Sequence, residues 1–139
     1  MRQMDLTQVR KRLVEHESLE LMPYTCTAGK LTIGVGRNLT DRGISHETAM
    51  QMLDEDIDIV LGELQQAIPG WDNLRWNYKE ALVDLAYNMG VPRLMLFRKM
   101  LSAIEADDPE KAAAELLDSR YAQQVGQRAE NICALLRAS

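Results

Sequence analysis

The chain of 139 residues is poor in the residues on which small secreted, metal-binding and membrane proteins depend. Its two cysteines and two histidines are too few and too far apart for a disulfide framework or a structural zinc site. No window holds the roughly 18 uninterrupted apolar residues that a membrane span needs. Residues 1–20 carry charges throughout and no apolar core, so we expect no secretory signal. The expectation is a globular monomer with no metal, no cofactor and no membrane insertion.

An excess of basic charge is also absent. The chain has 16 Lys and Arg against 21 Asp and Glu, which gives a formal net charge of −5. A protein that binds nucleic acids through phosphate contacts needs a basic surface, so this class is excluded. The charge is uneven, because residues 1–43 are mildly basic and residues 44–139 are strongly acidic. Only the first third of the chain is suited to face an anionic polymer.

The first part of the chain predicts one helix followed by a hairpin. Residues 5–17 carry apolar side chains at helical spacing, and a turn signal at residues 27–30 separates two extended segments. The first segment, residues 21–26, contains Pro23 and suits an edge strand. The second segment, residues 31–36, alternates strictly between apolar and small or polar residues, which is typical of a strand with one apolar face.

After a loop through Asn38 and Gly43, the rest of the chain predicts helices only. With Ser45 as its N-cap, one long helix runs to Ile68 over about six turns. A second helix covers residues 73–89 and stops before Gly90 and Pro92. Shorter helices are expected at 93–105, 110–117 and 127–137.

This order of elements predicts an α+β fold with two lobes. We expect residues 1–44 to form a small hairpin lobe, residues 45–68 a connecting helix, and residues 69–139 a larger helical lobe. A cleft between the lobes is the expected ligand site, and hinge motion about the connecting helix would open and close it.

The two faces of the strand at residues 31–36 differ in character. Its apolar face is predicted to be core and consists of Leu31, Ile33 and Val35. The opposite face carries Thr32, Gly34 and Gly36. Glycines in a strand allow a ligand to approach the backbone closely, or they mark a twist or bulge, and the pattern alone leaves both interpretations open.

Glu17 stands at the end of the first predicted helix, directly before the hairpin. A carboxylate at a helix C-terminus meets the negative end of the helix dipole, which favours its protonated form. Partial burial in a cleft acts in the same direction, so the position suits a general acid. The alternative is a solvated glutamate on an exposed helix end.

Two other motifs do not meet the requirements of the sites that they resemble. The acidic run at residues 54–58 lacks the glycine and the glutamate of a calcium loop, whose places are taken by Ile59 and Gln65. We expect this run to be a solvated helix face. The segment at residues 34–39 lacks the third glycine of a dinucleotide-binding motif, because Leu39 stands there.

Three segments together resemble the phage-type lysozymes, the family of the T-even phage endolysin. They are His16-Glu17-Ser18-Leu19, Pro23-Tyr24, and the run from Gly29 to Leu39 with Thr-Ile-Gly-Val-Gly inside it. The family's catalytic triad is Glu, eight residues, Asp or sometimes Cys, five residues, then Thr. Glu17, Cys26 and Thr32 match this spacing, with cysteine at the middle position.

The resemblance implies the bilobed lysozyme fold and cleavage of the β-1,4 bond between N-acetylmuramic acid and N-acetylglucosamine in peptidoglycan. It assigns Glu17 as the general acid that protonates the leaving oxygen. Cys26 would assist at the opposite face of the sugar, as base, as nucleophile or by holding water, and Thr32 would orient that water. Without the resemblance, Cys26 reads equally as a small buried hydrophobe, which is what we expect of Cys133.

The resemblance also extends to the edges of the site. Gly34 and Gly36 would make room for a sugar ring, and Tyr24 and Asn88 are candidate substrate contacts. Asn88 lies in Tyr87-Asn88-Met89-Gly90, which looks like the family's motif lining the cleft. Arg128 would pair near Glu17 and set its pKa.

Two neighbours of Glu17 depart from the family pattern. His16 stands where the family often has an acidic residue that receives the arginine, and Ser18 replaces a common glycine.

For biological role, the resemblance implies a phage or prophage muramidase. Such an enzyme waits in the host cytoplasm for a holin pore and acts on the wall in the periplasm, or it travels on a particle. Two alternatives stay open at this point: a non-catalytic wall-binding or scaffold module on the same fold, and a lytic transglycosylase, for which Glu17 alone would suffice.

Overall fold

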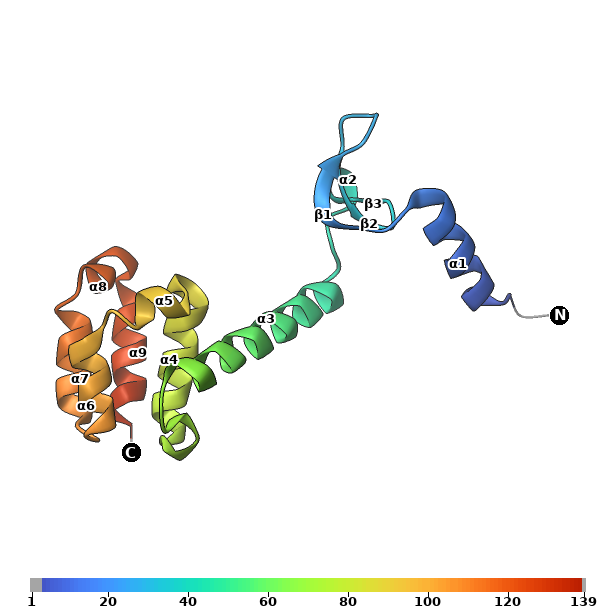
Figure 1. Cartoon of the computed structure of the whole chain (residues 1–139). Helices are drawn as coiled ribbons and strands as arrows, with labels where there is room; N and C mark the ends of the chain where they lie inside the picture. The colour runs from blue at the N-terminus through green and yellow to red at the C-terminus, as the bar shows by residue number, and fades with distance from the viewer. Residues whose placement is uncertain (1–3, 139) are drawn as a thin grey trace. The chain divides into compact units, whose positions relative to one another are not determined.

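The computed structural model describes residues 4–138 and divides into two compact units, Met1–Met50 and Gln51–Ser139. The first unit holds the strands and the second holds only helices (Figure 1). This arrangement confirms the predicted α+β class. The proposed role of residues 45–68 as a connection between lobes stays a prediction. Across the described residues, no helix combines the length and the apolar character needed to cross a membrane.

The first unit begins with helix α1 (Leu6–Glu17), whose first turn is capped by Asp5. The carboxylate of Asp5 accepts a hydrogen bond from the backbone N–H of Thr7 at 3.0 Å, which satisfies one of the free amides at the helix start. An antiparallel sheet in the order β1-β2-β3 follows. Its strands are β1 (Glu20–Thr25), β2 (Leu31–Gly34) and β3 (Arg37–Asn38).

The segment predicted as a loop after the hairpin is instead ordered as β3 and the short helix α2 (Leu39–Arg42). Asn38 caps α2, because its side-chain oxygen accepts from the backbone N–H of Asp41 at 3.0 Å. The Thr40 hydroxyl accepts from the backbone N–H of Leu31 at 2.8 Å and so ties α2 to β2. Polar residues that suggested a loop are therefore the capping residues of a helical turn.

The predicted apolar face of the second strand is wrong. Leu31 is 46% exposed and Val35 is 38% exposed, whereas Thr32 is only 4% exposed. β2 is the central strand, and Thr32 pairs with Tyr24 on one side and with Asn38 on the other. Regular alternation also ends at Gly34, where the strand stops with a positive φ of 69°. Thr32 is consequently the one residue of the described range 4–50 that is buried.

The long helix α3 (His46–Ala67) is continuous over its 22 residues, as predicted. Ser45 begins it, because its hydroxyl accepts from the backbone N–H of Thr48 at 3.0 Å. The remaining elements are η1 (Trp71–Asn73), α4 (Trp76–Met89), α5 (Val91–Leu94), α6 (Arg98–Glu105), α7 (Pro109–Leu117), α8 (Arg120–Val125) and α9 (Gln127–Arg137). The helix predicted at 93–105 is thus divided at Phe97, and α8 was not predicted.

The helical unit owes its stability to one apolar core. Helix α9 packs against α4 and α7, and α7 packs against α6 (Figure 1). The largest fully buried side chains come from α3, α4, α5, α6, α7 and α9, and include Leu64, Tyr78, Leu82, Leu85, Leu94, Met100, Leu116, Ile132 and Leu136. Cys133 is buried among them, as predicted. Each such side chain removed from water contributes about 1.5–3 kcal/mol before entropy is counted.

A cluster of polar side chains lies beside this core, between the start of α4 and the turn before α7. The Tyr78 hydroxyl donates to Asp107 Oδ1 at 2.7 Å, and Arg75 Nη2 bonds to the same oxygen at 2.7 Å. Burial and the hydrogen bond to the Asp107 carboxylate raise the pKa of Tyr78 to about 12. The buried phenol therefore keeps its proton and holds α4 to the turn between α6 and α7.

Candidate active site

The three predicted catalytic residues all belong to the first unit. Glu17 is the last residue of α1, Cys26 follows β1, and Thr32 lies in the middle of β2. Pairing of β1 with β2 places Tyr24 opposite Thr32, so Cys26 and Thr32 come together at the closed end of the hairpin. The backbone N–H of Cys26 donates to the carbonyl of Lys30 at 2.9 Å, which fixes that end.

The Lys30 carbonyl also orders Thr32. The Thr32 hydroxyl donates to this carbonyl at 2.9 Å, so one oxygen receives hydrogen bonds from the Cys26 backbone and from the Thr32 side chain. Because Thr32 is buried, this bond satisfies a hydroxyl that would otherwise be costly to remove from water. The lone pairs of the hydroxyl remain able to accept a further hydrogen bond.

The surroundings of Cys26 favour its thiolate. The backbone N–H groups of Lys30 and Ala28 lower the pKa of the Cys26 thiol, against an opposing effect of desolvation. The side chain is partly exposed. Cys133 contrasts with it, since burial raises the pKa of that thiol. Only the first cysteine has the exposure and the lowered pKa of a reactive thiol.

Glu17 lies against the turn between β2 and β3. A Cβ atom built on Gly36 would stand 2.9 Å from Glu17 Oε2 and 3.4 Å from Glu17 Cδ. Gly36 also has a φ of 67°, which side chains with L configuration rarely adopt. The carboxyl group thus lies against bare backbone, in the space that a side chain at position 36 would take.

The chain leaves Glu17 through a strained residue. Ser18 has φ 61° and ψ 169°, a region that is populated almost only by glycine. Here the chain turns from α1 into β1 after a single further residue, Leu19. Strain of this kind costs about 1–3 kcal/mol and persists only where the surrounding structure requires the conformation.

The other predicted site residues are placed as follows. Tyr24 is half-buried in β1, and Gly34 has a positive φ with open space around it. In the helical unit, Asn88 Oδ1 accepts from the Tyr121 hydroxyl at 2.8 Å, which orients the side-chain amide. Arg128 is engaged by Asp84. The substrate-binding and supporting roles of these residues stay predictions.

The pairing of Arg128 with Asp84 was not predicted. Arg128 Nε donates to Asp84 Oδ1 at 2.8 Å, and Nη2 lies 2.7 Å from the same oxygen. A third bond runs from Nη2 to the Asp84 carbonyl at 3.2 Å and joins α9 to α4. The sequence did hold one indication of this ion pair. Asp84 is a charged residue that stands between two pairs of buried residues of α4, Ala81-Leu82 and Leu85-Ala86. Both side chains line a groove of about 560 Å³ together with Tyr87.

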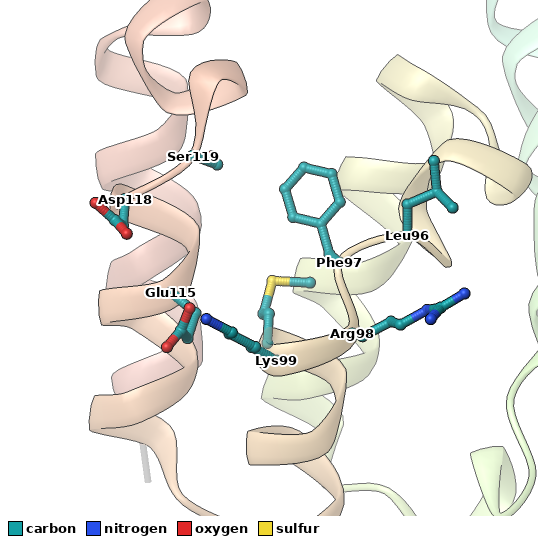
Figure 2. Close-up of a pocket in the computed structure, with 8 residues that line it drawn as sticks. Leu96, Phe97, Arg98, Lys99, Glu115, Asp118 and Ser119 are labelled. Atoms are coloured by element: carbon teal, nitrogen blue, oxygen red, sulfur yellow. The ribbon is translucent and has the colours of Figure 1, made fainter.

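A second concavity of the helical unit, of about 410 Å³, carries charges of both signs. Figure 2 shows Lys99 on one wall, extending toward Glu115, with Asp118 beyond it and Phe97 between the walls. Leu96 and Met100 add apolar surface to this lining. In the described part of the chain, no three His, Cys, Asp or Glu side chains converge as metal ligands would.

The strain at Ser18 leads to a prediction on stability. Replacing Ser18 by glycine should raise the free energy of unfolding by about 1 kcal/mol, because the relief of strain exceeds the added freedom of the unfolded chain. Ser18→Ala is the matched control, since it removes the hydroxyl and keeps the strain, and it should leave stability unchanged or lower. Urea unfolding of the three proteins measures this. A glycine variant that is no more stable than wild type would contradict the strained geometry.

Comparisons with known proteins show which family the chain belongs to. The family model for phage lysozyme matches residues 14–137. The chain is 31% identical to the pre-baseplate central spike protein Gp5 of Enterobacteria phage T4 over 111 residues, 73% of this chain but only 19% of the spike protein. It is 23% identical to a probable T4-type lysozyme 2 of Dictyostelium discoideum, with 87% of each chain covered. With residues 14–137 matched by the family model, the chain belongs to the phage lysozyme family, whose members are glycoside hydrolases.

Proposed function

We propose that this chain is an active muramidase that hydrolyses the β-1,4 bond between N-acetylmuramic acid and N-acetylglucosamine in peptidoglycan. The observation that carries the proposal is the position of Glu17 against the β2–β3 turn, in the same unit as Cys26 and Thr32, which both donate a hydrogen bond to the Lys30 carbonyl. Membership of the phage lysozyme family supports the substrate. The matching triad spacing supports the roles of the three side chains.

Glu17 is the general acid of the proposed reaction. Its protonated carboxyl gives a proton to the glycosidic oxygen as the bond between this oxygen and the sugar C1 breaks. A carboxyl group must reach the substrate to do this, and Glu17 is an exposed residue. The positive charge that develops on the sugar ring then has to be met from the other face.

Cys26 is the base of the proposed reaction. A thiolate whose pKa is lowered by two backbone N–H groups takes a proton from a water molecule as the water oxygen bonds to C1. Thr32, fixed by the Lys30 carbonyl, accepts a hydrogen bond from this water and aims it. One water is consumed, and the thiol and the Glu17 carboxylate exchange a proton with solvent before the next turnover.

Two routes of delivery to the wall fit this activity: release from the host cytoplasm through a holin pore, and carriage on a phage particle. The similarity to a central spike protein supports the second route. The spike protein is much longer than the segment that matches this chain, so the way in which the spike assembles is not carried over to this chain.

The experiment that tests the proposed function compares two isosteric variants on purified peptidoglycan. Glu17→Gln should lower the rate of release of soluble fragments by at least ~10²-fold, because an amide has no proton of suitable pKa to give. Glu15→Gln is the matched control, since it makes the same change on an exposed residue of α1, and it should keep the wild-type rate. If wild type releases nothing while binding the polymer, the chain is a wall-binding module and the proposal is wrong.

A second prediction concerns the sulfur of Cys26. Cys26→Asp should keep substantial activity, because it supplies a carboxylate at the same place, whereas Cys26→Ala should lose about 10²-fold. Iodoacetamide should inactivate wild type and spare Cys26→Asp, whose remaining thiol, Cys133, is buried. Because the pKa of Cys26 is lowered, the alkylation rate should rise with pH through a midpoint below that of a free thiol. An alanine variant with the wild-type rate would make Cys26 a packing residue.

A further inference from the structure

We propose that Gly36 is a positioning residue for the Glu17 carboxyl group. Its lack of a side chain makes room primarily for this general acid and only secondarily for a sugar ring. The catalytic part of this inference rests on the proposed function. The contact itself is a property of the first unit alone, because α1 and the β2–β3 turn both belong to it.

The contact distinguishes Gly36 from the other glycines that the structure describes. A Cβ at Gly36 would meet three atoms of one side chain, Glu17 Oε2 at 2.9 Å, Cδ at 3.4 Å and Cγ at 3.6 Å. Built on Gly90, it would meet one ring atom of Pro92 at 3.9 Å, which is ordinary contact. At the remaining glycines it would meet nothing within 4 Å. At Gly36, therefore, the space that a side chain would occupy is taken by the carboxyl group of Glu17.

The geometry determines what a methyl group at this position would do. The nearest atom is the far end of a flexible side chain, so Glu17 can move aside by rotation without disturbing the fold. A methyl group at position 36 should therefore displace the carboxyl group more than it lowers the stability of the fold. A displacement of about 1 Å in a catalytic group is enough to cost ~10²-fold in rate.

The other end of Glu17 is held by the backbone. Glu17 closes α1, and Ser18 keeps a conformation rare for serine so that β1 can begin directly. The side chain therefore starts from a defined backbone position and lies against Gly36, and the residue as a whole is exposed. A general acid needs this combination of a defined position and open access to the leaving oxygen.

The test compares Gly36→Ala with Gly43→Ala, a matched control in the same unit. Both glycines have a positive φ, 67° and 57°, so a side chain strains the backbone in both variants, but a Cβ at Gly43 would meet nothing within 4 Å. We expect similar losses in unfolding midpoint. We expect kcat on peptidoglycan to fall at least ~10-fold in Gly36→Ala with KM little changed, and a shifted pH profile, whereas Gly43→Ala keeps both. Equal kcat and pH profile in the two variants would overturn the inference.

A measurement on the wild-type fold keeps the inference testable if Gly36→Ala does not fold or if the chain proves inactive. The backbone amide resonance of Gly36, followed by NMR as the pH is lowered, should shift in one step as the Glu17 carboxyl takes its proton. This step should be absent in Glu17→Gln and absent at the Gly43 amide of wild type. A Gly36 resonance that ignores Glu17 would show that the carboxyl group is seated elsewhere, whatever the activity of the enzyme.

Discussion

The contact between the Glu17 carboxyl group and the bare backbone of Gly36 is the constraint on which the proposed active site depends. It brings the end of the first helix against the turn between β2 and β3. Two local features make it possible: the strained turn at Ser18 and the positive φ of Gly36. Both are costly for residues with side chains, which is the usual sign that geometry is kept for function.

The second fixed point is the Lys30 carbonyl, which receives hydrogen bonds from the Cys26 backbone and the Thr32 hydroxyl. This carbonyl gives the buried Thr32 hydroxyl a defined direction, and the backbone N–H groups of Lys30 and Ala28 beside it lower the pKa of the partly exposed Cys26 thiol. A thiol without these neighbours is mostly protonated at neutral pH and is a poor base. In the proposed mechanism, Cys26 takes the place of the triad's acidic residue, and the backbone N–H groups around it supply the hydrogen bonds that favour its thiolate.

Sequence reasoning identified what depends on local pattern. Periodicity and capping residues predicted the long helix α3 and the hairpin, and a short motif gave the triad spacing. Such signals can be recognised without knowledge of the tertiary structure. The burial of Thr32 could not be read in this way, because it follows from β2 having a strand on each side. The role of Gly36 and the partner of Arg128 depend equally on which distant residues meet, and no spacing in one chain encodes that.

The central claim, that Glu17 and Cys26 together drive addition of water to C1, is tested most directly by the products formed in water labelled with oxygen-18. Mass spectrometry of the muropeptides released by wild type should find the label at the new reducing end of N-acetylmuramic acid, one solvent oxygen per bond cleaved. Products that are unlabelled and one water lighter carry an anhydro sugar. They would show that Glu17 catalyses a transglycosylase reaction in which Cys26 activates no water, and the account of the site would be wrong.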